Sequence, residues 1–137
     1  IVAEAKFLRA LAYYNLVTLF ENVPLVTAPA SPTERPGAAT PAQTWTQIEQ
    51  DLADAAGALP VSYGGGDAGR ATRGAALGML GKARLQQRKW AEAAQALTQV
   101  IGLGRYSLLP SYADNFRQET ENTNAESLFE VQTEDMW

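Results

Sequence analysis

Residues 72–103 read TRGAALGMLGKARLQQRKWAEAAQALTQVIGL, and this stretch decides the fold. Apolar residues recur in it at helical spacing, in two runs that a short polar link separates. The first run predicts a helix over residues 72–87. The second predicts a helix over residues 90–103, which Gly104 ends in the left-handed conformation. Two amphipathic helices joined by so short a link form an antiparallel hairpin.

The sides of these two helices differ in composition. One side of the first helix carries Ala76, Met79, Leu80 and Ala83, and an adjoining side carries Gly74, Gly78 and Gly81. Three helical glycines cost roughly 2 to 3 kcal/mol relative to alanines, so we expect a close helix contact that offsets this cost. The second helix is expected to turn inward Trp90, Ala93, Ala94, Leu97, Val100 and Ile101.

The N-terminal part of the chain predicts another hairpin. Residues 3–20 predict a helix with two apolar stripes, which we expect to be sandwiched between neighbours. One stripe is Phe7, Ala10, Leu11, Tyr14 and Val17, and the other is Leu8, Ala12, Leu16 and Leu19. Residues 40–43 form a capping box, with a threonine N-cap, a proline at the first helical position and a glutamine three residues after the cap. The helix that begins there turns inward Trp45, Ile48, Leu52, Ala55 and Leu59, and Pro60 ends it.

An internal repeat relates the two hairpins. A shift of 69 residues places Leu8, Leu11, Ala12 and Leu16 over Leu77, Leu80, Gly81 and Leu85. A shift of 45 residues places Trp45, Ile48, Leu52 and Ala55 over Trp90, Ala93, Leu97 and Val100. The first hairpin therefore holds 24 more residues between its helices (69 minus 45), and this insertion is a proline-containing loop over residues 21–40. From the repeat we expect Leu11, Leu52, Leu80 and Leu97 to be buried together.

The fold class that follows is all-α, with stacked antiparallel helical hairpins that resemble tetratricopeptide repeats in an α-α superhelix. We expect one domain over residues 1–137, itself a piece of a longer protein. It comprises a helix pair over 3–59 with the loop 21–40 inserted, a helix pair over 72–103 and a tail over 104–137. In the tail, residues 127–132 predict a strand or an extended segment. Two pairs are fewer than such arrays need for stability, so further chain or a partner is expected to cover the open ends.

Composition excludes several classes of function. The chain has no His and no Cys, which excludes His-dependent nucleophiles, His/Cys zinc sites and disulfides. The net charge of -4 argues against nucleic acid as a partner, and the uncharged stretch near the start is too short to span a membrane. Glu49, Asp51 and Asp54 have the pattern of ordinary acids on a helix surface, and no spacing singles out a catalytic carboxylate pair. We expect no catalytic residue, metal site or cofactor.

Two aromatic residues are candidates for ligand binding. Tyr63 lies in the glycine-rich loop over residues 60–69, and Trp137 ends the tail, so no core pattern includes either side chain. An aromatic ring outside a core can stack on the apolar face of a sugar. Trp45 and Trp90, in contrast, occupy inward helical positions, and we expect both in the core.

A run of positive residues is a second candidate surface. Its members are Arg70, Arg73, Lys82, Arg84, Arg88 and Lys89, and the stretch contains no acidic residue. The arginines of this run cluster on the side of the helix away from its apolar face, as a solvated side would. The alternative is a docking patch for an acidic surface, either on a partner or on this chain's own acidic tail.

Several segments, taken in order, resemble the SusD/RagB family of nutrient-binding outer-membrane lipoproteins. They are Ala3-Glu4-Ala5-Lys6-Phe7-Leu8-Arg9-Ala10, Val23-Pro24-Leu25-Val26, Ile48-x-x-Asp51-Leu52-x-x-Ala55 with Leu59-Pro60, Gly69-Arg70-Ala71-Thr72-Arg73-Gly74-Ala75-Ala76 and Gly104-Arg105-Tyr106-Ser107-Leu108. Where the family often has glycine before the Val-Pro segment, this chain has Glu21-Asn22, so we expect Asn22 to take the left-handed turn. No ligand-contacting motif of the family matches this chain residue by residue.

The resemblance implies a non-catalytic protein on the surface of the outer membrane that captures oligosaccharides or other nutrients and passes them to a TonB-dependent transporter. The helical hairpins would then be scaffold and transporter-facing surface, loop aromatics would bind the ligand, and a lipid anchor outside this chain would hold the protein to the membrane. Two other functions stay open. One is a generic tetratricopeptide-type scaffold that binds a protein partner and no small ligand, and the other is a glycan hydrolase with an acidic site.

Overall fold

The computed structural model describes the chain except for residues 30, 32, 34, 68, 117–123 and 132–137. Most of the described part is helical, in α1 (Val2–Phe20), α2 (Pro41–Ala58), α3 (Arg73–Gln86) and α4 (Trp90–Gly102). Two short 3-10 helices, η1 (Gly65–Asp67) and η2 (Tyr112–Phe116), lie in the loop after α2 and in the tail. The sheet of the described residues consists of the two-residue strands β1 (Val23–Pro24) and β2 (Ala38–Ala39), so the predicted all-α class is confirmed.

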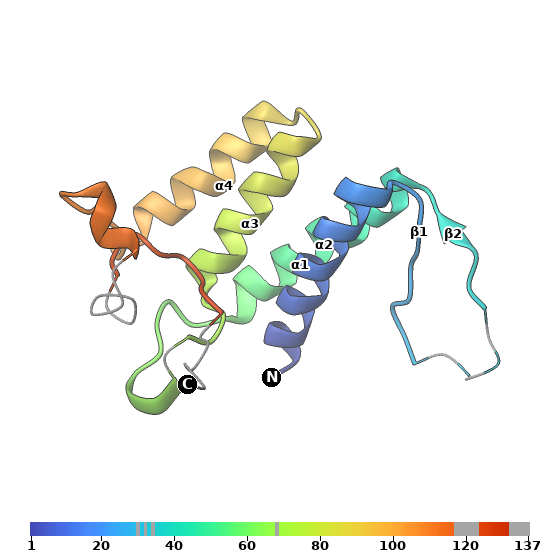
Figure 1. The fold of residues 1–137 in the computed structure, drawn as a ribbon, viewed down its shortest axis with the longest axis horizontal. Helices are drawn as coiled ribbons and strands as arrows, with labels where there is room; N and C mark the ends of the chain where they lie inside the picture. The colour runs from blue at the N-terminus through green and yellow to red at the C-terminus, as the bar shows by residue number, and fades with distance from the viewer. Residues whose placement is uncertain (30, 32, 34, 68, 117–123, 132–137) are drawn as a thin grey trace.

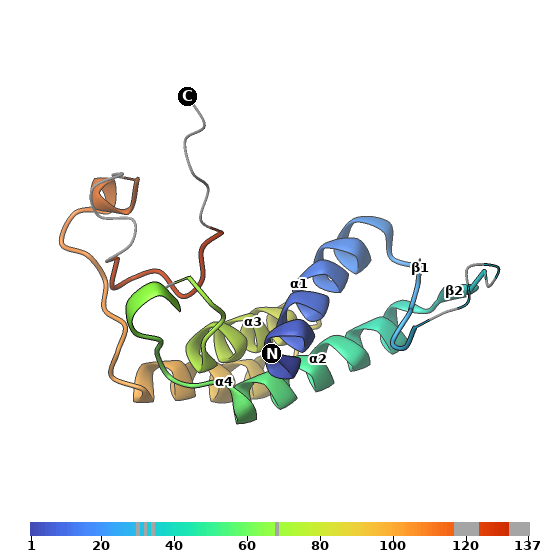
Figure 2. The ribbon, with the colours of Figure 1, turned by 90° about the horizontal axis from the view of Figure 1, so that it is seen from below.

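The helices stack in chain order as two antiparallel hairpins (Figure 1). α1 lies against α2, α2 against α3, and α3 against α4, whereas α1 and α3 make only a small contact. The strand pair extends from one end of the α1/α2 hairpin, and the tail lies on the opposite side of the molecule (Figure 2). This arrangement brings the start of α1, the loop before α3 and Phe129 of the tail together around one pocket.

Threonine side chains fix where α2 and α3 begin. The backbone N–H of Gln43 donates to the Thr40 hydroxyl, and the backbone N–H of Thr40 donates to the Gln43 side chain at 2.9 Å. The predicted capping box is therefore confirmed. The backbone N–H of Ala75 donates to the Thr72 hydroxyl at 3.2 Å and caps α3 in a similar way.

Residues with positive φ mark the ends of three helices. Gly104 has a φ of 62°, which confirms its predicted place after α4, and Arg88 has a φ of 61° in the link between α3 and α4. After α1 the positive φ, 58°, falls on Glu21, so the expectation that Asn22 takes this conformation is wrong. The reason is that α1 ends at Phe20, which makes the next residue the one that must reverse the chain.

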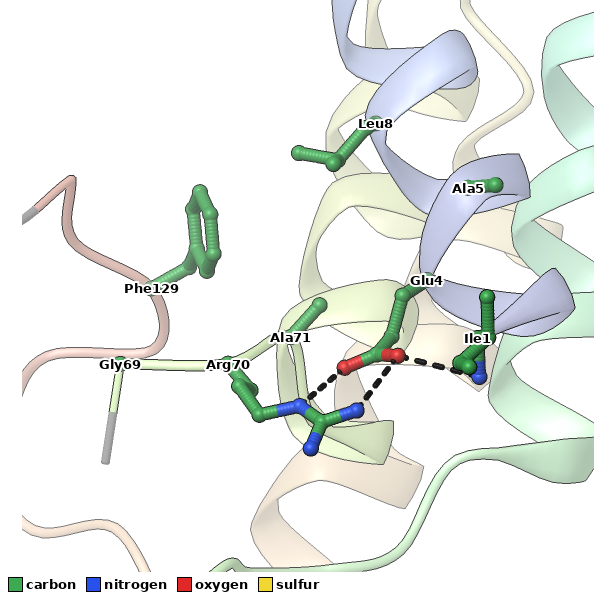
Figure 3. Close-up of a pocket in the computed structure, with 8 residues that line it drawn as sticks. All are labelled: Ile1, Glu4, Ala5, Leu8, Gly69, Arg70, Ala71 and Phe129. Carbon is green, nitrogen blue, oxygen red and sulfur yellow. Dashed lines mark hydrogen bonds and ion pairs between the residues drawn. The ribbon is translucent and has the colours of Figure 1, made fainter. Parts of the chain in front are cut away.

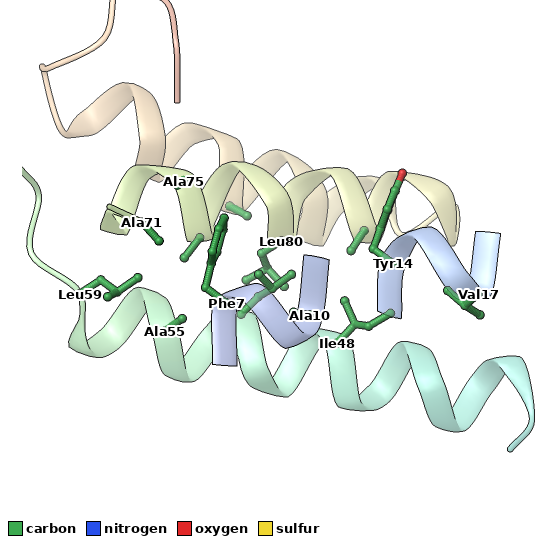
Figure 4. Close-up of a cluster of buried hydrophobic side chains, with 14 residues drawn as sticks. Phe7, Ala10, Tyr14, Val17, Ile48, Ala55, Leu59, Ala71, Ala75 and Leu80 are labelled. Atoms are coloured by element: carbon green, nitrogen blue, oxygen red, sulfur yellow. The ribbon is translucent and has the colours of Figure 1, made fainter. Parts of the chain in front are cut away.

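The core lies where α1, α2 and α3 meet (Figure 4). Its buried members are Phe7, Ala10, Tyr14, Val17, Ile48, Leu52, Ala55, Leu59, Ala71, Ala75, Ala76, Leu80, Ala83 and Ala96. The predicted inward side of α2 is confirmed, since Ile48, Leu52, Ala55 and Leu59 are all buried. Of the four leucines that the repeat places in equivalent positions, Leu52 and Leu80 are buried, and Leu11 and Leu97 are half-buried.

Only one of the two apolar stripes of α1 lies in the core. Phe7, Ala10, Tyr14 and Val17 are buried, as predicted. The second stripe, Leu8, Ala12, Leu16 and Leu19, is exposed, so the expectation that α1 is sandwiched is wrong for the part of the chain that the structure describes. The physical reason is position, because α1 is the first helix of the stack and packs on α2 along one side only.

α4 is the last helix of the described stack, and α3 covers it on one side. Ala93, Ala96 and Val100 are its buried residues. The inward placement predicted for Trp90, Ala94 and Ile101 is wrong, since all three side chains are exposed. The helical spacing of apolar residues identifies an apolar face on α4. This face is wider than the strip of α4 that α3 buries.

The two helical tryptophans differ in their surroundings. Trp45 is half-buried against the core and meets the Tyr14 ring edge-on at a centroid distance of 5.6 Å, which agrees with its predicted core position. Trp90 is 62% exposed, so its predicted core position is wrong. The 69-residue shift accounts for the difference, because it places Ala83 of α3 where α1 has Tyr14, so α3 offers Trp90 no aromatic ring at this position.

The three glycines of α3 lie against side chains of two different segments, α4 and the tail. A Cβ atom at Gly81 would lie 2.7 Å from Cδ2 and Cγ of Leu97, so the close contact expected between helices is confirmed at this position. A Cβ at Gly78 would lie 2.8 Å from Leu128, and one at Gly74 would overlap the ring of Tyr106. These two glycines therefore admit side chains of the tail and not of a helix.

Gly81→Ala is expected to destabilise the protein despite the better helix propensity of alanine. Crowding against Leu97 costs about 1 to 3 kcal/mol and exceeds the gain of about 1 kcal/mol from replacing a helical glycine. The matched control is Gly57→Ala in α2, where a Cβ meets no atom within 4 Å and the same exchange should stabilise the protein. Denaturant unfolding of both variants measures the difference, and a stabilised Gly81→Ala variant would contradict the close packing of α3 and α4.

The inserted loop and the tail have little regular structure. In the loop, β1 and β2 pair antiparallel, with Val23 opposite Ala39. The side chain of Arg9 donates to the Thr27 carbonyl at 3.0 Å and fastens the base of the loop to α1. In the tail, residues 124–131 form no strand, and Phe129 packs edge-on against Phe7 at a centroid distance of 4.9 Å.

Candidate functional site

A pocket of about 430 Å³ lies between the start of α1, the loop before α3 and the tail (Figure 3). Its lining residues are Ile1, Glu4, Ala5, Leu8, Gly69, Arg70, Ala71 and Phe129. Figure 3 shows Leu8 and Phe129 on either side of the opening, with the charged pair Glu4 and Arg70 below them. The pocket therefore combines apolar walls with one polar end.

The polar end is an ion pair that joins residues far apart in the sequence. Nε of Arg70 donates to Glu4 Oε1 at 2.6 Å, and a second guanidinium nitrogen donates to Oε2 at 2.8 Å. Arg70 also donates to Asp67 at 2.9 Å. A bidentate guanidinium–carboxylate pair has a fixed geometry, so it holds the loop before α3 against the start of α1.

The charges around Glu4 keep its carboxyl group ionised. Hydrogen bonds from Arg70 are the largest cause that lowers the pKa of Glu4 from its ordinary value of 4.5 to about 2. The pKa of Arg70 is raised by the hydrogen bond to Glu4 and then by the one to Asp67. At neutral pH this end of the pocket therefore presents a fixed carboxylate and a fixed guanidinium, which can accept and donate hydrogen bonds.

Acid is expected to weaken the attachment of the loop to α1. The pKa of Glu4 is lower in the folded state, so its stabilising contribution is present above pH 4.5 and is lost as the pH falls toward 2. Over this interval the thermal midpoint of the parent should fall more steeply than that of Glu4→Gln, which cannot titrate at this position. Equal slopes for the two proteins would show that the pair does not contribute to stability.

Tyr63, one of the two predicted ligand residues, contacts both members of this ion pair. Its hydroxyl donates to Glu4 Oε1 at 3.4 Å, and the guanidinium carbon of Arg70 lies 4.9 Å from the centre of its ring. Partial burial and the Glu4 charge raise the pKa of the phenol, so the hydroxyl keeps its proton at neutral pH. Tyr63 is half-buried and is not itself a lining residue of the pocket. The other predicted ligand residue, Trp137, lies outside the described residues.

The acids of α2 are not the ordinary surface residues that the sequence predicts. Asp51 is 1% exposed, and both of its carboxylate oxygens accept hydrogen bonds from Arg9 at 2.7 Å. Asp54 pairs with Lys6, so two successive turns of α1 are tied to α2 by ion pairs. The expectation is therefore wrong for Asp51, because α1 covers the side of α2 that carries it. These carboxylates connect α1 to α2, and neither is a lining residue of the pocket.

The positive run of residues is partly neutralised within the chain. Glu49 of α2 accepts hydrogen bonds from Arg84 at 3.2 Å and from Lys89. Arg70 is occupied by Glu4 and Asp67. Internal pairing therefore involves acids of α1, α2 and the loop before α3. In the described part of the tail, Glu126 instead accepts hydrogen bonds from the backbone of Leu109 and from Asn115.

The described residues include neither a metal-binding cluster nor a membrane-spanning helix. No group of three or more acidic, histidine or cysteine side chains is placed to hold a metal ion. None of the described helices is long and apolar enough to cross a membrane. The lining of the pocket can bind a ligand through apolar contact and hydrogen bonds.

Most of the pocket could not be found from the sequence. Glu4 and Arg70 are separated by 66 residues, and no local spacing connects them. Phe129 belongs to a segment whose pattern predicts a strand or an extended segment, and neither prediction identifies what the ring contacts. The one available signal was the glycine-rich loop, because it is long enough to bring Tyr63 and Arg70 back toward the first helix.

Comparisons with known proteins give this arrangement a context. A SusD-like family model described as "Starch-binding associating with outer membrane" matches residues 1–85. A SusD-like protein of Formosa agariphila is 33% identical over 123 residues, which are 88% of this chain and 23% of that protein. The structure of a SusD-like protein from Bacteroides fragilis has a TM-score of 0.89 and 27% identity, over 98% of this chain and 27% of the other. That of a laminarin-binding SusD-like protein has a TM-score of 0.84 and 41% identity, over 93% and 29%.

These matches cover most of this chain but only a small part of each relative. The chain spans about a quarter of the length of these relatives. The family model covers more than half of the chain, and the structural matches cover nearly all of it with the same arrangement of helices. The chain therefore belongs to the SusD-like family of carbohydrate-binding proteins that associate with the outer membrane.

Proposed function

We propose that this chain is part of a non-catalytic protein that binds an oligosaccharide at the outer membrane and passes it to a TonB-dependent transporter. The observation that carries the proposal is the pocket in which Glu4 and Arg70 meet apolar walls, with Tyr63 in contact with both charged side chains. A sugar ring has an apolar face and a rim of hydroxyls, which matches such a surface. The laminarin-binding relative, 41% identical to this chain, makes laminarin the first glycan to test.

The state of Glu4 supports binding without catalysis. Glycoside hydrolysis requires two carboxyl groups across the scissile bond, one of which has a raised pKa and carries a proton. The pKa of Glu4 is lowered to about 2, so this carboxyl cannot serve as the acid at neutral pH. The neighbouring Asp67 accepts a hydrogen bond from Arg70 and is held in the same charged cluster.

The alternative function, a scaffold that binds only a protein partner, predicts that the positive run is the functional surface. Two of its members, Arg84 and Lys89, are engaged by Glu49, and a third, Arg70, is engaged by Glu4 and Asp67. This pairing reduces the charge available to an acidic partner. Reversal of the charges of Arg73, Arg84 and Arg88 should therefore leave glycan binding unchanged, whereas the scaffold function predicts loss of a partner.

Tyr63→Ala is expected to weaken laminarin binding several-fold without unfolding the protein. Loss of the ring removes its cation–π contact with Arg70, a lining residue of the pocket, and such a contact contributes about 0.5 to 1 kcal/mol at an exposed site. The matched control is Tyr63→Phe, which keeps the ring and loses only the weak 3.4 Å hydrogen bond to Glu4. Calorimetric titration of the parent and both variants measures the affinities. Equal affinity of Tyr63→Ala and the parent would place the ligand elsewhere in the protein.

A further inference from the structure

Phe129 is the part of the pocket wall that comes from the tail. The other lining residues belong to the start of α1 and to the loop before α3. The Phe129 ring lies across the opening from Leu8 (Figure 3) and packs edge-on against Phe7 of the core at a centroid distance of 4.9 Å. The position of this wall therefore depends on how the tail lies on the helices.

Two contacts attach the tail to α3. Leu128, the residue before the pocket wall, lies over Gly78, where a Cβ atom would come within 2.8 Å of the leucine Cδ1. The Tyr106 ring lies over Gly74 in the same way, and the hydroxyls of Tyr106 and Thr72 hydrogen-bond at 3.0 Å. Gly74 and Gly78 are four residues apart, so they share one side of α3. These two contacts, Tyr106 on Gly74 and Leu128 on Gly78, are called the tail contacts below.

The described segments of the tail, 104–116 and 124–131, are bound to each other but are weakly buried. The backbone N–H of Ser107 donates to the Ala125 carbonyl at 3.1 Å and joins the two segments. No residue of either segment is fully buried. A segment with so little buried surface opens at a lower free energy than the helices, so its docking responds to the loss of a single contact.

We propose that Gly78 and Leu128 are positioning residues of the pocket, because their contact fixes Phe129 in the wall and thereby sets the affinity for a glycan. The inference rests on the proposed function, since it concerns the same site. A ligand that touches Phe129 binds the protein with a docked tail more tightly than the protein with a released tail. Glycan binding and tail docking then stabilise each other by the same factor.

Two variants of the full-length protein weaken the tail contacts, one from each side. Gly78→Ala places a methyl group against Leu128. Its matched control is Gly81→Ala, the same exchange in the same helix, where the nearest atoms belong to Leu97 of α4. Leu128→Ala removes the leucine side chain and leaves α3 unchanged. Its matched control is Leu108→Ala, because Leu108 also lies in the tail and is 83% exposed.

Affinity for laminarin is measured by calorimetric titration, and docking of the tail by hydrogen exchange of the peptide that contains Ser107. We expect Gly78→Ala and Leu128→Ala each to weaken laminarin binding at least about fivefold and to speed exchange in this peptide. Both control variants should change the affinity less than about twofold. In the Leu128→Ala background, Gly78→Ala should have no further effect, because the side chain that it would meet is gone. Saturating laminarin should slow exchange of the Ser107 peptide in the parent.

Laminarin affinities of Gly78→Ala and Leu128→Ala that equal the parent's would overturn the inference and leave the proposed function intact. Equal losses for Gly78→Ala and Gly81→Ala would also overturn it, because the effect would then come from α3 as a whole. If Gly78→Ala does not fold, the comparison of Leu128→Ala with Leu108→Ala decides by the same criterion. Failure of the parent to bind laminarin and starch oligosaccharides would overturn the proposed function and this inference together.

Discussion

Replacing Arg9 with methionine is expected to lower the free energy of unfolding by about 3 to 5 kcal/mol, because it leaves the Asp51 carboxylate buried without its cationic partner. The Asp51 side chain is 2% exposed, and Arg9 holds its two oxygens at 2.7 Å. Methionine retains much of the aliphatic part of the arginine side chain, so the main loss is the charge. Urea denaturation of the parent and the variant measures the change.

Two further variants separate the buried charge from a general effect on the contact between α1 and α2. Lys6→Met removes the Lys6–Asp54 pair, which joins the same helices but is more than one-third exposed at both side chains, so its effect should be much smaller. Arg9→Met combined with Asp51→Leu removes both charges and should recover much of the lost stability. A loss for Arg9→Met no greater than that for Lys6→Met would contradict the importance of the buried pair.

Leu80→Ala is expected to cost about 2 to 5 kcal/mol, because Leu80 is 5% exposed in the core where α3 meets α1 and α2. The matched control lies in the same helix. Leu85 is 41% exposed, so Leu85→Ala removes the same atoms from a site that already contacts water and should change stability little. Thermal unfolding of both variants tests the assignment, and an unchanged midpoint for Leu80→Ala would contradict it.

The helices could be predicted from the sequence because their signals are local. Thr40 and Gln43 form a capping box within four residues, and Gly104 follows the end of an apolar period. The apolar spacing of α2 likewise identifies its buried side, because that helix has neighbours on both flanks and one apolar face.

The burial of α1 and α4 could not be predicted in the same way. Both helices have more apolar surface than one neighbour covers, and the sequence does not say which part a neighbour reaches. Leu8 and Leu16 have the same spacing as the buried stripe but lie on the uncovered side of α1. Trp90 repeats the position of Trp45, yet the ring that Trp45 meets has no counterpart in α3.

The candidate site depends on contacts between distant residues. The sequence identifies Tyr63 as an aromatic outside the core, and the structure places it beside Arg70 and Glu4. The pairing of Glu4 with Arg70 follows from the way the hairpins stack, which no short motif specifies. For the same reason the sequence pattern predicts Asp51 on the helix surface, whereas α1 buries it in the structure.

Titration of the protein with laminarin, followed by a count of reducing ends in the same mixture, tests most directly whether it binds a glycan without cleaving it. We predict a saturable heat of binding and no increase in reducing ends during prolonged incubation. Absence of binding by the full-length protein to laminarin and to starch oligosaccharides would contradict the proposed function. Reducing ends that increase with time and disappear in the Glu4→Gln variant would contradict the assignment of a non-catalytic site.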